Sequence, residues 1–298
     1  MKIHKLAAID IGSNSIRLLV SNVITDKKTT LFKKSSLTRL PIRLGADSFS
    51  KGKISKKNME KLKIGMQAYR RIMEVHEIER YRACATSALR EASNGQDVIK
   101  MVLEETGVNI ELIDGKEEAK IIFNSQLISS IRDQEDTFLY IDVGGGSTEL
   151  TLFHEDDIIA SQSFKIGTIR LLQNMVHKDH WDEMRDWIKL NTKKYDDILM
   201  VGSGGNINRT FKMSDKKAGH FLSIDYLENT YDLLQKFTPE ERMMKFDLNP
   251  DRADVITHAL KIYKSAMTWA RSERMLVPKQ GLADGMVRNM FEEHFQVK

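Results

Sequence analysis

Two short segments, residues 8–18 and 140–150, each carry an aspartate, a glycine and small polar residues at the end of an apolar stretch. The aspartates are Asp10 and Asp142, and a Gly, a Ser and a Leu follow each of them at the same offsets. Glycine permits a tight reversal of the chain, and amides that point the same way form a concave site for phosphate. A carboxylate beside phosphate has a use for a hydrated divalent cation. The residue types therefore indicate phosphate and metal chemistry at two equivalent loops.

A single glycine loop would be weak support for this chemistry. Residues 144–146, three consecutive glycines, would by themselves most often form an ordinary turn. Two copies at strand ends, each with its aspartate, and a third glycine-rich turn at 202–205 are harder to obtain from turn chemistry alone. The repetition favours a phosphate site over three unrelated turns.

The segments that must position these loops alternate between strand and helix patterns. Runs rich in Ile, Leu and Val predict strands at residues 6–12, 16–24 and 29–35, and further strands are expected at 80–85 and 110–113. Helical spacing predicts helices that begin after the N-cap Ser55, near 89–91 and at 95–106. From residue 114 the order restarts, with a helix at 116–131, strands at 138–141, 149–153, 158–164, 198–201 and 275–277, and a final helix at 284–295. This order predicts an α/β fold with an internal duplication.

The length and composition fit an ordinary enzyme with two domains. A chain of 298 residues exceeds the usual size of one core, and 41% hydrophobic residues suffice for packed interiors. The expected domains are residues 1–120 and 121–283, and the last helix, about 284–298, is expected to pack back on the first domain. With 30% charged residues and a mean hydropathy of −0.39, no stretch has the pattern of a membrane span.

The charge pattern is mild. A net charge of +4 fits solvated helix faces, with a cationic rim that steers a polyanion as the alternative. No run interleaves aromatic with basic residues as a nucleic-acid platform would.

The chain has one cysteine, Cys84, which excludes an intramolecular disulfide and a four-cysteine zinc site. A reducing cytoplasm fits this usage. We expect Cys84 to be a small buried residue at a strand end rather than a nucleophile. His177 and His180 have the spacing of metal ligands, but no second pair accompanies them, so a polar helix junction is expected.

Five motifs in a fixed order resemble those of the exopolyphosphatase and guanosine-pentaphosphatase family. They are residues 10–17, 85–92, 115–119, 142–149 and 202–205. Residues 252–256 and 281–285 look like the family's late segments, so the resemblance covers nearly the whole chain. It implies the two-domain, ribonuclease H-like fold of the actin, Hsp70 and sugar-kinase superfamily, with the active site in the cleft between the domains.

The resemblance also implies hydrolysis of a phosphoanhydride bond. The expected reaction is the Mg²⁺-dependent release of the terminal phosphate of inorganic polyphosphate. The rival reaction removes the γ-like phosphate of guanosine pentaphosphate, with guanosine tetraphosphate as a further ligand. Mn²⁺ could replace Mg²⁺, and K⁺ could take part. A homodimer in the cytoplasm, without DNA, RNA or membrane partners, is the expected form.

Such hydrolysis needs an oriented water, a base that takes its proton and positive charge for the transferring group. The motif match assigns the general base to Glu118, whereas sequence physics alone does not choose between Glu117 and Glu118, since both suit a helix N-terminus. Arg90 matches a contact to the terminal phosphate, and a guanidinium fork suits two phosphate oxygens. Without the resemblance, Arg90 would be read as a surface arginine.

We also expect metal and phosphate ligands in the two loops. The metal is expected at Asp142, directly or through water, with Asp10 and Glu149 assisting, because Mg²⁺ needs few carboxylates and keeps several waters. The phosphate-binding residues are expected to be Gly12, Ser13, Asn14, Gly144, Gly145, Ser147 and Thr148. Arg17 and Arg252 are candidates for contacts farther along the substrate, although Arg17 would be unremarkable as an exposed strand arginine.

Two readings from other classes stay open. An ATP-dependent kinase of the same superfamily would require an adenosine pocket at 202–206 and an acceptor other than water, which a catalytic Glu118 disfavours. A sensor that binds nucleotide or polyphosphate and signals through hinge closure would keep the same residues without turnover, and a fold never proves activity.

Overall fold

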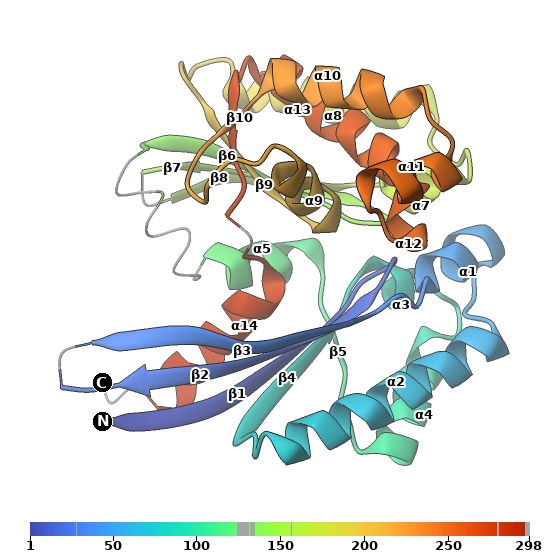
Figure 1. Cartoon of the computed structure of the whole chain (residues 1–298), viewed down its shortest axis with the longest axis vertical. Helices are drawn as coiled ribbons and strands as arrows, with labels where there is room; N and C mark the ends of the chain where they lie inside the picture. The colour runs from blue at the N-terminus through green and yellow to red at the C-terminus, as the bar shows by residue number, and fades with distance from the viewer. Residues whose placement is uncertain (28, 124–130, 132–134, 156, 279, 296–298) are drawn as a thin grey trace. The chain divides into compact units, whose positions relative to one another are not determined.

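The computed structural model describes residues 1–27, 29–123, 131, 135–155, 157–278 and 280–295. The chain forms two compact units, Met1–Ile128 with Gly281–Lys298, and Ser129–Gln280. Each unit contains one β-sheet and several helices (Figure 1). The α/β class expected from the sequence is confirmed, and the predicted domain boundaries stay a prediction.

The first unit is built on a five-stranded sheet of order β3-β2-β1-β4-β5. Its strands are β1 (Lys2–Ile11), β2 (Ile16–Thr25), β3 (Thr30–Leu40), β4 (Arg80–Ala85) and β5 (Glu111–Leu112). The first three form an antiparallel meander, and β4 and β5 run parallel to β1. Its described helices are α1 (Leu44–Lys51), α2 (Lys56–Val75), α3 (Ser87–Glu91), α4 (Gly95–Thr106), α5 (Gly115–Phe123) and α14 (Leu282–His294).

Strand β1 is buried on both faces, which explains its continuous apolar run. Leu6 and Ala8 pack with Cys84 of β4 in a core that includes Met286 and Phe291 of α14. Ala7, between them on the opposite face, is also fully buried. Cys84 has no exposed surface, so the expectation of a small buried residue is confirmed.

Helix α14 lies so close to α5 that one of its glycines has no room for a side chain. A Cβ on Gly285 would lie 2.4 Å from the carbonyl oxygen of Ile121, a backbone atom that moves only with its helix. Alanine inside a helix normally stabilises by roughly 1 kcal/mol relative to glycine, but overpacking costs about 1–3 kcal/mol. We therefore expect Gly285→Ala to lower the melting temperature.

Gly65→Ala in α2 is the matched control for this prediction. A Cβ on Gly65 would lie 3.1–3.4 Å from the methyl ends of Leu40, Ile16 and Ile42, which are side-chain atoms that can shift slightly. Its melting temperature should stay equal to that of the wild type or rise. A Gly285→Ala protein that melts no lower than Gly65→Ala would contradict the close packing of α14 on α5.

Asp47 ties α1 to the start of α2. Its carboxylate accepts hydrogen bonds from the Ser55 amide (3.1 Å), the Ser55 hydroxyl (2.5 Å) and Asn58 Nδ2 (2.7 Å), and Lys51 Nζ lies 3.2 Å away. Ser55 is the N-cap of α2, as the sequence predicts. Burial raises the pKa of Asp47, but the hydrogen bonds from Ser55 and its neighbours outweigh burial and hold the pKa below its usual value.

We expect Asp47→Asn to lower the free energy of unfolding near pH 7 by about 1–3 kcal/mol, because the buried donors lose their charged acceptor. Since the folded pKa lies below the ordinary value of 3.8, this stabilisation is present above that value and is lost as the pH falls through the folded pKa. Thermal melts of both proteins should therefore differ most near neutral pH and converge only as the pH falls below 3.8 and through the folded pKa. Asp232→Asn, at an exposed position of α10, serves as control. A constant difference at every pH would contradict the assignment.

The second unit is built on a six-stranded sheet of order β10-β11-β9-β6-β7-β8. Its strands are β6 (Thr137–Val143), β7 (Thr148–His154), β8 (Asp157–Phe164), β9 (Leu199–Ser203), β10 (Leu222–Ser223) and β11 (Arg274–Leu276). Its described helices are α7 (Thr168–Leu172), α8 (Lys178–Thr192), α9 (Gly205–Met213), α10 (Ile224–Gln235), α11 (Pro239–Phe246), α12 (Pro250–Ala253) and α13 (Ile256–Ala270).

Five strands of the second sheet repeat the topology of the first. β6, β7 and β8 pair antiparallel, as β1, β2 and β3 do, while β9 runs parallel to β6, and β11 parallel to β9. The two hairpins also share their register, with Asp10 opposite Arg17 and Asp142 opposite Glu149. The internal duplication expected from the sequence is confirmed.

Helix α8 packs on the core of the second unit and begins with the two histidines. Trp181 and Trp187 of α8 and Trp269 of α13 lie against the buried residues of that core. His180 Nδ1 accepts a hydrogen bond from the His177 amide at 3.1 Å, which forms part of the N-terminal cap of α8. The histidine pair is thus a polar helix junction.

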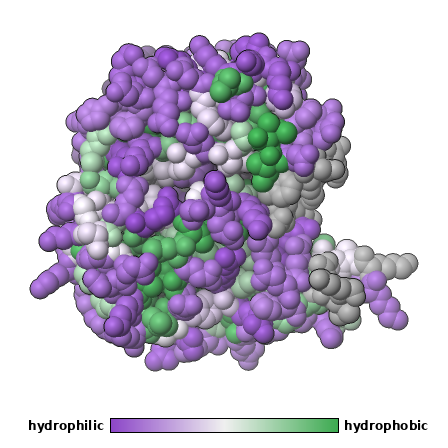
Figure 2. All heavy atoms as spheres, turned by 180° about the vertical axis from the view of Figure 1, so that it is seen from behind, coloured by the Kyte–Doolittle hydropathy of each residue, from purple (hydrophilic) through white to green (hydrophobic). Residues whose placement is uncertain are grey.

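The surface has few hydrophobic areas on the face that Figure 2 shows. That face is largely hydrophilic, and hydrophobic side chains are exposed there in smaller, separate areas (Figure 2). Among the described residues, no helix combines the length and the apolar character that crossing a membrane requires.

Candidate functional site

The first loop closes the hairpin of β1 and β2 and is fixed by backbone hydrogen bonds. The Gly12 amide donates to the Ser15 carbonyl (3.2 Å), and the Ser13 carbonyl accepts from the Gly45 amide (2.9 Å). A Cβ on Gly45 would lie 2.8 Å from the Cβ of Ser13, so this approach requires glycine. Asn14 is half-buried in the same loop. The start of α1 therefore sets the conformation of the first loop.

Asp10 and Arg17 lie opposite each other beside this loop. Arg17 Nη1 is 3.5 Å from Asp10 Oδ2. Burial raises the pKa of Asp10, and the charge of Arg17 opposes that rise. The folded state therefore holds the proton of Asp10 more tightly than the unfolded chain does. As a result, the free energy of unfolding falls as the pH rises from the ordinary pKa of 3.8 through the raised pKa of the folded state. A buried carboxylate that costs stability is typical of a functional position.

Asp10 and Glu118 lie within electrostatic reach of one thiol. Cys84 is the register partner of Asp10 on β4. Burial raises the pKa of Cys84 to about 12, and the charges of Asp10 and Glu118 both add to the rise. The first unit thus places two of the acids that the sequence singles out within electrostatic range of Cys84.

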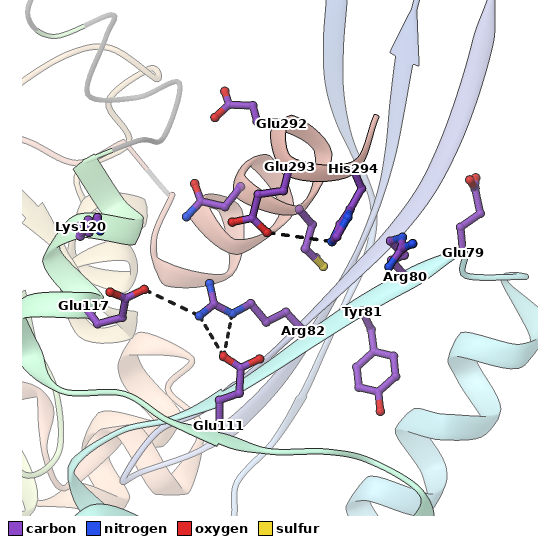
Figure 3. A pocket seen from close by; sticks show the side chains of 12 residues that line it. Glu79, Arg80, Tyr81, Arg82, Glu111, Glu117, Lys120, Glu292, Glu293 and His294 are labelled. Carbon is purple, nitrogen blue, oxygen red and sulfur yellow. Dashed lines mark hydrogen bonds and ion pairs between the residues drawn. The ribbon is translucent and has the colours of Figure 1, made fainter. Parts of the chain in front are cut away.

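Burial distinguishes the two adjacent glutamates of α5. Asp114 caps this helix, since its Oδ1 accepts from the amides of Lys116 (2.9 Å) and Glu117 (2.8 Å). Glu118 follows in the first turn and is only 7% exposed. Glu117 instead lines a surface pocket, where its carboxylate lies 3.8 Å from the Arg82 guanidinium (Figure 3). The sequence pattern alone does not choose between these two glutamates. The buried environment of Glu118 favours it as the candidate base.

The pocket beside Glu117 has a volume of about 760 Å³ and a mixed charge. Arg82 at its base donates to Glu111 through Nε (3.0 Å) and Nη2 (2.9 Å) (Figure 3). Its lining consists of Glu79, Arg80, Tyr81, Arg82, Glu111, Glu117, Lys120, Asn289, Met290, Glu292, Glu293 and His294. The lining includes no residue that the sequence assigns to the site, so we give this pocket no part in the chemistry.

Helix α3 connects the first loop to the segment before α5. The hydroxyl oxygens of Ser13 and Ser87 are buried 2.9 Å apart, so the first residue of α3 contacts the first loop. Arg90, also on α3, donates through Nη1 to the Ile113 carbonyl at 2.6 Å. Ile113 precedes the cap of α5, and Arg90 is therefore held beside the segment that leads to Glu118.

The second loop closes the hairpin of β6 and β7 in the same way as the first. The Gly144 amide donates to the Ser147 carbonyl at 3.0 Å. The hydroxyls of Ser147 and Ser163 both donate to Oε1 of Glu149, at 2.5 and 3.1 Å. These bonds fix the orientation of a carboxylate that the sequence assigns to metal binding.

The carbonyls of the three loop glycines are held by the segment that begins α7. The carbonyls of residues 144–146 accept, in chain order, from the amides of Thr168 and Ile169 and from Nε of Arg170, at 3.0, 2.8 and 2.7 Å. In a trans peptide, the carbonyl of one residue and the amide of the next point in opposite directions. The amides of residues 145–147 therefore point away from α7, and such a set of amides makes an anion site.

The third glycine turn follows β9 and lies against Asp142. Gly204 has a φ of +121°, and a Cβ there would lie 3.3 Å from Asp142 Oδ1 and 3.1 Å from the Val143 carbonyl oxygen. The Ser203 hydroxyl donates to Asp142 Oδ2 at 3.2 Å, and the Tyr263 hydroxyl donates to the Ser203 carbonyl. The second unit thus brings the second and third glycine turns together around Asp142.

Thr148 and Arg252 are the two remaining residues of the second unit that the sequence assigns to substrate binding. Thr148 is fully buried and its hydroxyl donates to the Ile166 carbonyl at 2.6 Å, so its role in phosphate binding stays a prediction. Arg252 lies half-buried on the short helix α12. Its role in distal substrate contacts stays a prediction.

Asp142 and Glu149 suit a hydrated hard cation. They are register partners on antiparallel strands, so their Cβ atoms are roughly 4.5–5.5 Å apart. Like charges directly opposite each other destabilise a sheet, and a cation between them would remove that cost. In the first unit Arg17 occupies the position equivalent to Glu149 and already pairs with Asp10. Within the described residues no three His, Cys, Asp or Glu side chains form a metal-binding group, so a metal at Asp142 would keep mostly water or substrate oxygens as ligands.

Sequence reasoning missed Gly167 and Arg170. A Cβ on Gly167 would lie 2.4 Å from the carbonyl oxygen of Gly145, so the close approach requires glycine. The available signal was the position of Gly167 within a few residues of the end of an expected strand, as Gly45 follows the end of β3 in the first unit. In both units a glycine that follows the third strand packs against the glycine loop of that unit's first hairpin.

Comparison with known proteins agrees with this architecture. The sequence profile described as the Ppx/GppA phosphatase family matches residues 23–294. The chain is 29% identical over 293 residues to the bifunctional 3-dehydroquinate synthase/phosphatase of Fusobacterium nucleatum, a match that covers 91% of this chain but only 44% of that protein. It is 32% identical over 282 residues to exopolyphosphatase 2 of Mycobacterium tuberculosis, covering 86% of this chain and 88% of that one.

A solved structure supports the fold as well. The crystal structure of an exopolyphosphatase from Cytophaga hutchinsonii matches with a TM-score of 0.83 and 23% sequence identity, over 97% of this chain and 98% of the other. Since the family profile covers most of the sequence, this chain belongs to the Ppx/GppA phosphatase family.

Proposed function

We propose that this chain is an exopolyphosphatase, which hydrolyses the terminal phosphoanhydride bond of inorganic polyphosphate and releases orthophosphate. The observation that carries the proposal is the buried carboxylate of Glu118, in the first turn of α5, in a chain that belongs to a phosphatase family. The similarity to a protein named exopolyphosphatase 2 supports the same substrate.

Glu118 is the general base in this proposal. It orients the attacking water and takes its proton. Because the buried carboxylate is already held in position, it needs little reorganisation for this step. The amides of residues 145–147 hold the terminal phosphate, and the first loop is the second group of phosphate-binding residues in the proposal. Arg90 binds phosphate oxygens with donors that its bond to Ile113 does not use, since a guanidinium has five N–H groups.

Asp142 would hold Mg²⁺, directly or through water, with Glu149 on the neighbouring strand. When bound, the ion neutralises charge on the phosphate oxygens. Asp10 would assist through water, because its carboxylate already pairs with Arg17. Mn²⁺ is the alternative ion, since it accepts the same oxygen ligands.

Guanosine pentaphosphate is the rival substrate. Its terminal anhydride would be cleaved by the same residues, and the matching profile describes a family named for both Ppx and GppA phosphatases. In either case Arg17 and Arg252 are the candidates for contacts to the part of the substrate beyond the terminal phosphate.

A phosphate-release assay with Mg²⁺ separates these functions. Polyphosphates of several chain lengths, guanosine pentaphosphate and ATP would be compared at equal concentrations of terminal phosphate. The proposal expects the highest kcat/KM on polyphosphate. A preference for guanosine pentaphosphate would replace it, phosphate transfer from ATP to an acceptor would indicate a kinase, and binding of any of them without turnover would indicate a sensor.

A further inference from the structure

We infer that Arg170 is a positioning residue for phosphate binding, because its guanidinium fixes the direction of the Ser147 amide. The inference rests on the proposed function, in which the amides of the second loop hold the terminal phosphate. Arg170 would touch the loop rather than the substrate, and its effect would reach the phosphate through one peptide group.

The contact itself is well defined. Arg170 is 8% exposed, and its Nε donates to the Gly146 carbonyl at 2.7 Å in a buried environment. The backbone amide of Arg170 also lies 3.3 Å from the Gly145 carbonyl, so main chain and side chain both join the same loop. Since the Gly146 carbonyl and the Ser147 amide belong to one planar peptide, holding the carbonyl sets the direction of the amide.

The composition of the loop explains why an arginine is needed there. Three consecutive glycines give the unbound loop more conformational freedom than three residues of any other type would. That freedom must be removed before the amides can converge on an anion. Backbone amides of α7 hold the carbonyls of Gly144 and Gly145. Arg170 supplies the third bond, to Gly146. The first loop contains a single glycine and is held by the amide of Gly45.

Two substitutions separate the hydrogen bond from the charge. Arg170→Gln loses the charge but places an N–H donor as many bonds from Cα as Nε. Arg170→Lys keeps the charge but moves its only nitrogen one bond farther out, where it cannot donate from the same point. If the bond to the loop carbonyl matters, Gln preserves function better than Lys, which is the reverse of what a purely electrostatic role predicts.

The experiment measures the affinity of the full chain for inorganic phosphate by calorimetry in the presence of Mg²⁺, together with kcat and KM for phosphate release. For Arg170→Lys and Arg170→Ala we expect phosphate affinity and kcat/KM to fall by about 10- to 100-fold, the order of effect known for the loss of a side chain that orients a ligating group without touching the ligand. The phosphate affinity and kcat/KM of Arg170→Gln should stay within about 3-fold of the wild type. Gln keeps a donor to the same carbonyl, and the small loss reflects the exchange of a charged donor for a neutral one. Melting temperatures of all variants report whether they fold, and the Gln and Lys pair suffices if the Ala protein does not.

Arg242→Lys is the matched control. Arg242 is 7% exposed and its Nε also donates to a carbonyl, that of Leu234 at 2.9 Å, but its bonds go to helices α10 and α12 instead of the glycine loop. Its substitution should lower the melting temperature and leave phosphate affinity unchanged.

Three results would overturn the inference. They are a wild-type chain that does not bind phosphate, an Arg170→Lys protein that binds it as tightly as the wild type, and an Arg170→Gln protein weakened as much as Arg170→Lys. A wild type that binds phosphate but releases none from any substrate would instead contradict the proposed function, and the affinity series would still test Arg170.

Discussion

Glu118→Gln is expected to lower kcat for phosphate release by about 10²- to 10⁴-fold, the usual contribution of a general base. The amide has the shape of the carboxylate but cannot take the proton of the attacking water. Substrate binding should persist, because the phosphate contacts assigned above come from other residues. Steady-state phosphate release and direct titration of binding to polyphosphate measure the two effects separately.

Glu117→Gln is the matched control, since it makes the same change at the adjacent position. Glu117 lines the pocket of Figure 3 and lies 3.8 Å from Arg82, on a side of α5 that holds no predicted catalytic residue. It should keep a rate close to that of the wild type. A Glu118→Gln protein with normal turnover, or a Glu117→Gln protein that loses it, would reject Glu118 as the base.

Asp142→Asn is expected to have the second largest effect, a fall of about 10²- to 10³-fold in kcat/KM at a fixed low concentration of Mg²⁺. Charge stabilisation by a bound metal contributes several kcal/mol to such transition states, and about 1.4 kcal/mol corresponds to a factor of ten. The amide also keeps an acceptor for the Ser203 hydroxyl, so the fold around the third glycine turn should persist. Titration of the rate with Mg²⁺ should show a higher half-saturating concentration.

Asp157→Asn provides the control for this change. Asp157 begins β8 in the same sheet and is exposed. It should leave the Mg²⁺ response unchanged. If Asp142→Asn responds to Mg²⁺ as the wild type does, the metal is bound elsewhere.

The elements that local sequence determines were predicted well. The expected bounds 80–85 and 95–106 coincide with β4 and α4, and α4 ends where Gly107 takes the left-handed conformation. Helix α1 was not predicted, because its eight residues contain Gly45 and its burial depends on contact with the first loop. The helix expected at 116–131 is described as α5 only to Phe123, and residues 124–130 lie outside the described residues.

The candidate site also divides into features that local sequence determines and features that depend on tertiary packing. The two loops could be predicted because aspartate, glycine and serine at a strand end are adjacent in sequence. Gly167 and Arg170 could not, because their contact with residues 144–146 arises only when β8 has paired with β7 and α7 has packed on the loop. The difference in burial between Glu117 and Glu118 likewise arises only from the packing of α5, and the role of Glu118 as the base stays a prediction.

The most direct test of the central claim is a crystal structure of the Glu118→Gln protein with Mg²⁺ and a short polyphosphate. We predict that the terminal phosphate accepts hydrogen bonds from amides of both loops, 12–15 and 144–147. The side chain at position 118 should lie within hydrogen-bond distance of a water in line with the terminal phosphorus. A polyphosphate end bound away from either loop, or a position 118 remote from that phosphorus, would contradict the account.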